Sequence, residues 1–218
     1  MAELTSDLIL KAYAYGVFPM AKSRADHTVF WVQPKLRGVL PLDDFHVSRS
    51  LRKTLRQGKF TVTVDRAFGE VLEGCAETTP QRVDTWINSE IVRLFTELHH
   101  AGVAHSVETW LDGQLVGGLY GLAMGSAFFG ESMFSRATDA SKVALCHLVG
   151  ILRVGDFTLL DTQFITDHLA RFGVVEISQA DYLTQLTAAL TRSGKFGPAL
   201  NQRDLEAALF SQCNTQIS

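Results

Sequence analysis

The sequence predicts an α+β fold, and three observations support this class. Helix-like segments alternate with short strand-like runs up to residue 103. From Ala104 onward, three apolar runs separated by tight-turn residues indicate an antiparallel meander, and further helices and strands follow. The 218 residues are 46% hydrophobic and 20% charged, which excludes a disordered chain and suffices for a sizeable core.

The first part of the chain predicts four helices and three short strands. Glycines after the last periodic residue end two of the helices, at Gly16 and Gly102, and the alternation in FTVTVD is typical of a strand. The polar stretch Glu77–Asp84, which contains Pro80, is expected to be a mobile loop. The expected elements are helices over Asp7–Tyr15, His46–Lys59, Ala67–Ala76 and Asn88–Ala101, and strands over Thr28–Val32, Gly38–Leu40 and Phe60–Asp65.

The second part predicts the meander AHSVETWL, QLVGGLYGLA and SAFFGESM, with Asp112-Gly113 as a strong hairpin signal. A helix capped by Asp139 or Ser141 should run to Val154. Strand FTLLD, helix TDHLARF, strand VVEIS and helix Asp181–Arg192 complete the unit. We expect a smaller N-terminal α/β subdomain (1–60), a catalytic domain (61–193) and a helical tail (194–218).

A meander followed by a long helix and another strand is the layout of the acetyltransferase-like fold, and it suggests acyl transfer by analogy. Acetyl-CoA enzymes usually have a glycine-rich loop before that helix, whose backbone N–H groups bind pyrophosphate. The corresponding stretch, Ser135–Ser141, contains no glycine and includes Asp139. The sequence therefore favours an acyl donor other than acetyl-CoA.

Composition and targeting signals exclude several other classes. The net charge of −3 argues against a general polycation, and three distant cysteines argue against a disulfide framework or a structural zinc site. The N-terminus lacks the pattern of a signal peptide, and the longest uncharged run, Gln114–Gly130, is shorter than the about 20 residues of a membrane helix. We expect a cytoplasmic, monomeric protein that has no membrane partner, metal or cofactor.

Glu131 is the first candidate for chemistry, because it follows two phenylalanines at the end of a predicted central strand. A charge there is expensive to bury without a partner. The structural alternatives are an ion pair with Arg136 or a solvated strand end, and the residue pattern does not choose between these and a functional role.

Asp161 and Gln163 lie at the end of the later apolar strand, two residues apart and hence on the same side of an extended chain. A carboxylate and an amide at a strand end could position an amine. A helix begins soon afterwards, so on spacing alone a helix cap is the favoured interpretation. The scattered histidines form no catalytic triad, and Cys75 and Cys146 are interpreted as core residues.

The stretch Lys35–Lys59 carries seven basic and two acidic residues, a net charge of +5 on a chain whose total is −3. Four of the basic residues share one predicted helix face without acidic neighbours on it. A charge run is usually a solvated face, but the missing acidic partners favour phosphate binding. The four residues are Arg49, Arg52, Lys53 and Arg56.

Several motifs, in order and spacing, closely resemble the bacterial leucyl/phenylalanyl-tRNA–protein transferases over about Leu4–Leu190. They are FHVSRSLRK, AFxxVxxGCA, TWI, AHSVETW, LVGGLYG, FFGESMFSR, ASKVAL and LLDTQ. The resemblance implies an acetyltransferase-like catalytic domain. It also implies transfer of Leu, Phe or Met from an aminoacyl-tRNA to the N-terminal Arg or Lys of a protein, which marks that protein for degradation.

The resemblance further implies roles for individual residues. Asp161 and Gln163 match the catalytic pair, Glu131 and Trp110 match active-site positions, and the basic helix matches a surface that meets tRNA. The remaining matches are Trp31, near the donor site, and the hydrophobic pocket residues Leu119, Phe128, Leu145 and Leu148. From the pattern alone, this apolar set could equally be ordinary core.

Two other functions remain open at this point. One is an RNA-binding module that uses the basic helix with Trp31, Trp110 and Phe128 for base stacking. The other is a small-molecule N-acyltransferase that uses acetyl-CoA.

Overall fold

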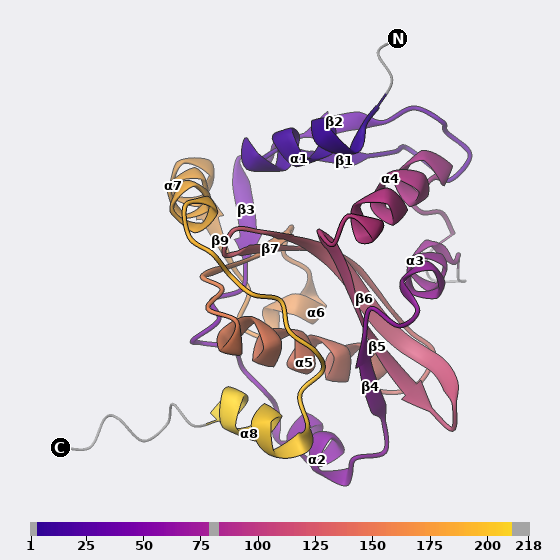
Figure 1. Cartoon of the computed structure of the whole chain (residues 1–218), viewed down its shortest axis with the longest axis vertical. Helices are drawn as coiled ribbons and strands as arrows, with labels where there is room; N and C mark the ends of the chain where they lie inside the picture. The colour runs from indigo at the N-terminus through magenta and orange to yellow at the C-terminus, as the bar shows by residue number, and fades with distance from the viewer. Residues whose placement is uncertain (1–3, 79–82, 211–218) are drawn as a thin grey trace, which may run out of the picture.

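The computed structural model describes residues 4–78 and 83–210 (Figure 1). Residues 79–82 of the loop that we expected to be mobile lie outside this range, as does the part of the expected tail beyond Phe210. Helices and strands occur in consecutive groups along the described chain, for example β1-β2-β3, α3-α4 and β5-β6-β7, and the α+β class is confirmed.

Seven strands form the central sheet, in the spatial order β4-β5-β6-β7-β8-β3-β9. In that order they span Thr61–Val64, Ala104–Leu111, Gln114–Met124, Ala127–Ser135, Leu159–Gln163, Leu36–Val39 and Val175–Ser178. Neighbouring strands are antiparallel except β7 and β8, which run parallel. The expected meander is β5-β6-β7, and α5 (Ala140–Val154) leads from it to β8, which is the acetyltransferase-like layout.

Helices cover both faces of this sheet (Figure 1). One core lies between the sheet and α5, α2 (Arg49–Gln57) and α8 (Gln202–Phe210). The other core includes buried residues of α1 (Ser6–Ala14), α3 (Phe68–Ala76), α4 (Ser89–His100) and α7 (Gln179–Leu190). The short helix α6 (Asp167–Ala170) connects β8 to β9. Cys75 and Cys146 are buried in these cores, as expected.

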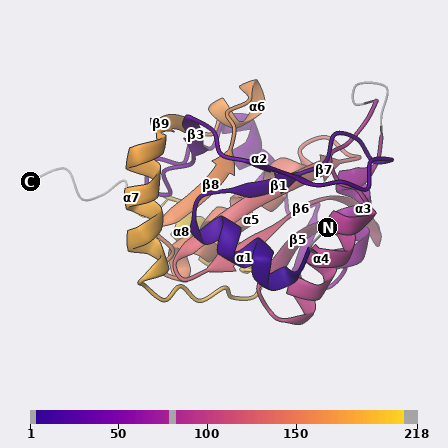
Figure 2. The same ribbon diagram turned by 90° about the horizontal axis from the view of Figure 1, so that it is seen from above.

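The N-terminal segment lies across one end of the sheet. It consists of α1 and a small separate sheet of β1 (Phe18–Met20) and β2 (Phe30–Val32). Figure 2, seen from above, shows α1 and β1 over the central strands, whereas α2 and α8 lie at the opposite end in Figure 1. This segment continues into β3, which enters the central sheet between β8 and β9. The division of the chain at residue 60 stays a prediction.

The predicted local signals explain most element boundaries. Asp112 and Gly113 both have positive φ, 51° and 77°, as a two-residue hairpin turn requires. Ser48 caps α2 by accepting a hydrogen bond from the Leu51 N–H, and the left-handed Gly58 ends it. This helix therefore begins three residues later than the expected start at His46.

The expected side-chain cap of α5 is wrong. Asp139 precedes this helix with φ 70°, and its carboxylate accepts from Lys142 Nζ at 2.8 Å and Thr54 Oγ1 at 3.1 Å instead of from the helix backbone. The Ser141 N–H donates to Ser135 Oγ at 3.3 Å. Tertiary partners of Asp139 thus override its local capping tendency.

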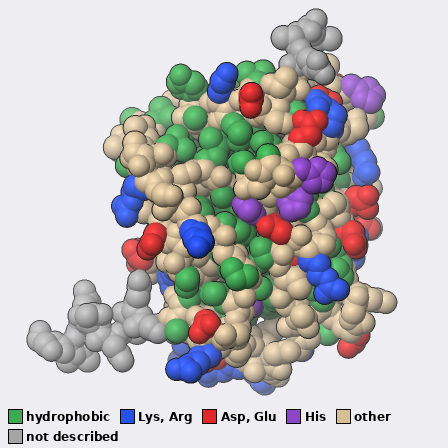
Figure 3. Space-filling view, viewed as in Figure 1, with side chains coloured by type: hydrophobic (Ala, Val, Ile, Leu, Met, Phe, Trp, Pro, Cys, Tyr) green, Lys and Arg blue, Asp and Glu red, His purple; other side chains and the backbone are tan. Residues whose placement is uncertain are grey.

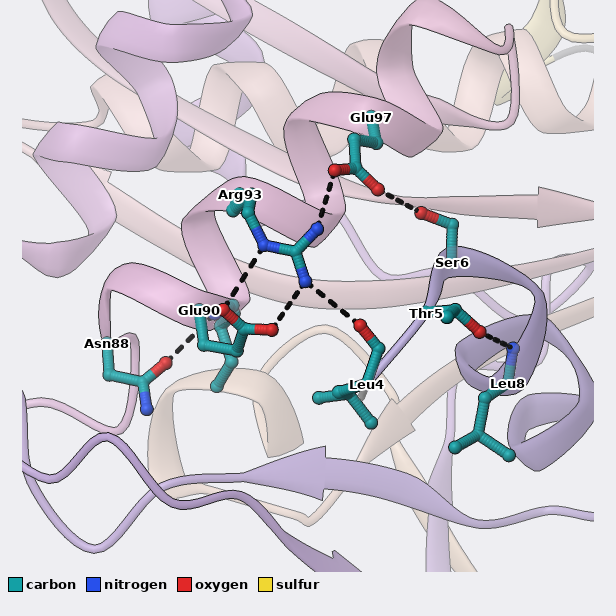
Figure 4. A network of polar contacts seen from close by, with 9 residues as sticks. Leu4, Thr5, Ser6, Leu8, Asn88, Glu90, Arg93 and Glu97 are labelled. Carbon is teal, nitrogen blue, oxygen red and sulfur yellow. Dashed lines mark hydrogen bonds and ion pairs between the residues drawn. The ribbon is translucent and has the colours of Figure 1, made fainter. Parts of the chain in front are cut away.

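A polar network fastens the N-terminal segment to α4 (Figure 4). Arg93 donates to Glu90 and Glu97 on its own helix and to the Leu4 carbonyl at 2.9 Å. Ser6 donates to Glu97 at 2.7 Å. These contacts hold the start of α1 against the body of the protein, so that the segment after α1 reaches the centre of the sheet.

Candidate active site

A pocket opens where the parallel strands β7 and β8 separate. They pair only over Ala127–Phe129 and Leu159–Asp161. Beyond this point a register shift lies between β6 and β7, where Tyr120 pairs with Ser132 and Gly121 with Gly130. Glu131 is therefore the extra residue of a bulge, a feature that often redirects side chains beside functional sites.

The pocket has a volume of about 220 Å³ and a mainly apolar wall. Three of its apolar residues were predicted for the amino-acid pocket: Leu119, Leu145 and Leu148. Met133, Leu160 and Leu169 extend this wall. Among its polar lining residues is Glu131, so the structure brings four of the predicted site residues to one cavity.

Glu131 is partly accessible through this pocket, and its surroundings favour the protonated form. Burial raises the pKa of Glu131 to about 8, and the nearby Asp161 carboxylate raises it too. The Tyr13 hydroxyl and the Arg37 guanidinium offset this only in part. A carboxyl group with such a pKa exchanges a proton readily near neutral pH.

Both structural alternatives for Glu131 are wrong. Arg136 pairs with Glu77, with 2.9 Å between Nη2 and Oε2. Glu131 lies inside the pocket wall instead of at a solvated strand end, and Gln163 Nε2 donates to its Oε1 at 3.4 Å. The Glu131 side chain is thus directed toward the residues that end β8.

Asp161, in the middle of β8, is completely buried and accepts four hydrogen bonds. Arg37 on β3 approaches it with both ends of its guanidinium fork, Nε to Oδ1 at 2.9 Å and Nη2 to Oδ2 at 2.6 Å. The Tyr182 hydroxyl donates to Oδ2 at 2.8 Å, and the Gln163 N–H donates to Oδ1 at 2.8 Å. Both carboxylate oxygens are therefore fully occupied by donors of the protein itself.

The helix-cap interpretation of Asp161 is wrong. The following helix, α6, is capped by Thr166, whose hydroxyl accepts from the Leu169 N–H at 3.2 Å. Asp161 and Gln163 are in contact, but the contact is made by the Gln163 backbone N–H and not by side chains on the same side of an extended strand, because Gln163 has φ 57°.

Sequence reasoning missed Arg37 and Tyr182. Arg37 enters the predictions only in the net charge of Lys35–Lys59, although this residue lies in the otherwise apolar run Leu36–Leu40 and is 1% exposed. An arginine inside an apolar strand needs a buried anionic partner, and this was the available signal. Tyr182 lies on α7 and carried no such signal.

His168 and Thr162 also line the pocket and had no predicted role. Burial lowers the pKa of His168, and the cations Lys142 and Arg171 lower it further, so its imidazole is mostly neutral at pH 7. It could donate or accept a hydrogen bond at the pocket wall.

Asp161 and Gln163 lie outside the pocket lining, and so do three other predicted residues. Phe128 is completely buried, and its ring stacks on that of Phe196 at 5.4 Å in the core beside α5. Trp110 on β5 donates from Nε1 to Thr63 Oγ1 at 2.8 Å. Trp31 on β2 is 40% exposed.

The four basic residues of α2 line a shallow depression on the surface, together with Gln57. Lys and Arg side chains are visible at the lower edge of Figure 3, where Figure 1 places α2. Helix α8 covers part of this face: the Arg52 guanidinium lies 4.0 Å from the centre of the Phe210 ring, and Arg56 is 3.7 Å from Glu206. The absence of acidic neighbours therefore holds along α2 but not across the tertiary structure.

Residues 4–78 and 83–210 offer neither a cluster of metal ligands nor a membrane-spanning helix. In this part of the chain, no group of three or more His, Cys, Asp or Glu side chains is arranged to hold a metal ion. None of its helices has both the length and the apolar character needed to cross a membrane.

Comparison with known proteins identifies the family. The family model described as leucyl/phenylalanyl-tRNA protein transferase matches residues 39–187, and the model of its N-terminal domain matches residues 2–35. A leucyl/phenylalanyl-tRNA–protein transferase of Paramagnetospirillum magneticum is 59% identical over 196 residues, 90% of this chain and 94% of the relative. One of Rhodospirillum rubrum is 56% identical over 209 residues, 96% and 97% of the two chains.

Among solved structures, a crystal structure of FemX aligns with a TM-score of 0.49 and 14% identity, over 90% of this chain and 69% of that one. The family rests on the sequence matches, which cover nearly the whole chain and agree with the motifs GESMFSR and LLDTQ. The chain belongs to the leucyl/phenylalanyl-tRNA–protein transferases, enzymes that transfer aminoacyl groups from tRNA to protein N-termini.

Proposed function

We propose that the chain transfers Leu, Phe or Met from aminoacyl-tRNA to an N-terminal Arg or Lys, acting as a monomer in the cytoplasm and creating a degradation signal. The observation that carries this assignment is the apolar pocket of about 220 Å³ at the separation of β7 and β8. Its size and leucine-rich wall suit a medium-sized apolar side chain that is unbranched at Cβ.

The lining of the pocket indicates that it accepts several apolar amino acids of the donor. Its apolar wall, formed by residues such as Leu119, Leu145 and Leu148, offers mainly dispersion contacts. A hydrophobic pocket discriminates one methylene by only about 1–3 kcal/mol. Leu, Phe and Met should therefore all be accepted, with modest preference among them.

The chemistry requires little base strength. The aminoacyl ester is already activated, and a free α-amino group has a pKa of about 7.7–8.0, so an appreciable fraction of it is neutral in the cytoplasm. Attack of the amine nitrogen on the ester carbonyl forms the peptide bond and breaks the bond to the ribose oxygen, and the amine proton must reach that oxygen. Catalysis then consists of orientation and proton handling.

We assign the proton handling to Glu131 and the orientation to Gln163. The pKa of about 8 supports Glu131 as a group that can both accept and donate a proton near neutral pH. The Gln163 amide, 3.4 Å from Glu131, supplies a hydrogen-bonding group beside it. Asp161 has no free oxygen for the incoming amine and is proposed to hold Gln163 in place.

The remaining predicted residues keep more distant roles in this proposal. Trp31 is exposed and available for stacking beside the donor. Trp110 and Phe128 support the sheet and the core from outside the pocket. The basic face of α2 (Arg49, Arg52, Lys53 and Arg56) would meet tRNA phosphates at the end of the molecule opposite the N-terminal segment.

Incubation with charged tRNA and a peptide that begins with Arg tests the proposal directly. Peptide mass should increase by one residue with Leu-, Phe- or Met-tRNA, and much less with tRNA that carries β-branched Val or Ile. A matched peptide that begins with Ala controls for acceptor choice. Binding of tRNA without any mass increase would instead support the RNA-binding module, and transfer from acetyl-CoA would support the N-acyltransferase.

A further inference from the structure

Strand β8 ends in a strained turn centred on Gln163. This residue has φ 57°, and the Phe164 N–H donates to the Thr162 carbonyl oxygen at 2.7 Å. Three-residue turns with positive φ at a residue other than glycine are rare, because the side chain is crowded by the backbone. Such a conformation persists only where the surrounding structure holds it.

Strand β3, into which the N-terminal segment continues, approaches this turn closely. Gly38 of β3 pairs with Gln163, and a Cβ atom on Gly38 would lie 2.8 Å from the Phe164 carbonyl carbon and 2.9 Å from Thr162 Oγ1. No side chain fits there, so glycine allows β3 to approach the turn closely. This close approach also places the neighbouring Arg37 beneath the turn.

Arg37 is held rigidly in that position. Its guanidinium lies between the rings of Phe18 and Tyr182, 4.6 and 4.5 Å from their centres, and its Nη1 donates to the Gly16 carbonyl at 3.1 Å. The remaining two nitrogens bind both oxygens of Asp161. A planar fork held by two rings and three hydrogen bonds leaves the carboxylate one orientation.

Asp161 transmits this orientation to the turn. Its Oδ1 accepts the Gln163 N–H at 2.8 Å, the bond that stabilises the unusual backbone conformation of that residue. With the backbone held, the Gln163 amide is directed at Glu131 in the pocket. The chain of contacts is therefore Arg37, Asp161, the Gln163 backbone, and finally the Gln163 amide.

We propose that Arg37 is a positioning residue of the transfer reaction, which acts through Asp161 to hold the Gln163 turn and aim its amide at Glu131. The proposal rests on the proposed function of the pocket. It gives the N-terminal segment a part in catalysis, because Gly16 and Phe18 of that segment hold Arg37 although neither lines the pocket.

Arg37→Lys tests the proposal, because it keeps the charge but loses the two-pronged bond. We expect kcat to fall by about 100-fold, a loss that misplacing a group by about 1 Å can cause, while the KM for aminoacyl-tRNA changes less than threefold. Arg153→Lys is the matched control. Arg153 is half-buried, donates to the carbonyls of Leu42 and Ala208 at 2.7 and 2.8 Å, and lies outside the pocket lining. It should lower the melting temperature but leave kcat within twofold.

A double-mutant cycle shows whether Arg37 acts through Gln163. If it does, Arg37→Lys should cost less than threefold in a Gln163→Ala background, because the group that it positions is already gone. Equal costs in both backgrounds would overturn the proposal. So would a kcat of Arg37→Lys within threefold of wild type.

A second measurement separates this proposal from the function on which it rests. In ¹⁵N-labelled protein, the backbone amide of Gln163 should shift and lose hydrogen-exchange protection in Arg37→Lys but not in Arg153→Lys. This readout needs no activity, so a wild-type protein without transfer activity would refute the function alone. If Arg37→Lys fails to fold, Tyr182→Phe removes one hydroxyl bond to Asp161 and should show the same pattern with a smaller loss of kcat, and unchanged kcat and Gln163 amide there would overturn the proposal.

Discussion

Two arginine–carboxylate pairs in this protein have the same chemistry and opposite surroundings. Arg37 and Asp161 are 1% and 0% exposed and form a two-pronged contact of 2.6 to 2.9 Å. Arg56 and Glu206 are 64% and 39% exposed and approach only to 3.7 Å. The first pair lies beneath the strained turn at Gln163, and the second connects the basic face of α2 to α8.

This difference distinguishes charged side chains that stabilise the fold from charged side chains that are available to a binding partner. Removing one member of a buried pair leaves the other uncompensated, at about 3–5 kcal/mol, whereas an exposed pair contributes about 0–1 kcal/mol. The Arg37–Asp161 pair, the buried centre, cannot be changed without changing the site. The charges of the basic surface are at least partly exposed. They can be altered one residue at a time without unfolding the protein, and they are available to the phosphates of a tRNA.

The largest effect is expected at the buried centre. Asp161→Ala should lower the free energy of unfolding by about 3–5 kcal/mol, because it strands the Arg37 guanidinium. It should also abolish most transfer, because Gln163 loses the bond to its backbone. Urea denaturation beside single-turnover transfer measures both effects. A loss of 0.5–2 kcal/mol with full activity, the signature of a mere helix cap, would contradict this assignment.

The pocket wall gives the next largest effect. Leu145→Ala should enlarge the cavity and shift transfer from Leu toward the larger Phe, at a cost of about 2–5 kcal/mol in stability. Phe128→Ala is the matched variant, since Phe128 packs on Phe196 outside the pocket and should destabilise without changing the Leu:Phe ratio. Competition between the two charged tRNAs measures the ratio. If Phe128→Ala changed the ratio and Leu145→Ala did not, the donor side chain would bind beside Phe128 in the core and not in this pocket.

Glu131 should make stability depend on pH. Its pKa of about 8 in the folded protein lies above the ordinary value of 4.5, so its stabilising contribution is complete below pH 4.5 and is lost as the pH rises through 8. The stability of wild type relative to Glu131→Gln should fall across this window by at most about 1.4 kcal/mol per pH unit. Chemical denaturation at several pH values measures it, and parallel curves for the two proteins would disprove the raised pKa.

The use of a relative stability matters because His147 titrates in the opposite sense. Burial lowers its pKa to about 4, below the ordinary 6.5. Its contribution is therefore present above pH 6.5 and lost as the pH falls through 4. Since both proteins in the comparison contain His147, its effect cancels.

On the basic surface, Arg52→Ala with Lys53→Ala should weaken binding of Leu- and Phe-charged tRNA alike. Each lost phosphate contact should lower the slope of log K against log salt by about 0.7–0.9. The apparent KM should rise, and turnover of a minimal aminoacyl-adenosine donor should stay unchanged. Salt titrations measure the slope, and a wild-type slope in this variant would place the tRNA elsewhere.

The smallest effect is expected for Glu206→Gln. The exposed contact with Arg56 should contribute less than about 0.5 kcal/mol to stability. Removing the acid should make the basic face more attractive to tRNA, a slight gain in affinity that disappears at high salt. A large destabilisation would show that the pair at the surface resembles the buried pair after all.

The sequence by itself was enough for the class, the meander, the long helix and the family. These features depend on local patterns: alternation in FTVTVD, Asp-Gly at the hairpin, and apolar periodicity along α5. Strand and helix periods are set by backbone geometry over a few residues, so a single chain displays them without its partners. The motifs around Glu131 and Asp161 also pointed to the ends of the two strands that separate.

Only the tertiary structure decided what those residues contact. Arg37 and Asp161 are 124 positions apart, and no sequence pattern around either residue indicates that they are in contact. The bulge directs Glu131 into the pocket and not toward Arg136. Phe128 packs on Phe196 in the core, and Glu206 of α8 lies beside Arg56. Partners and exact register come from packing between distant segments, and local pattern has no access to the burial and electrostatics that packing creates.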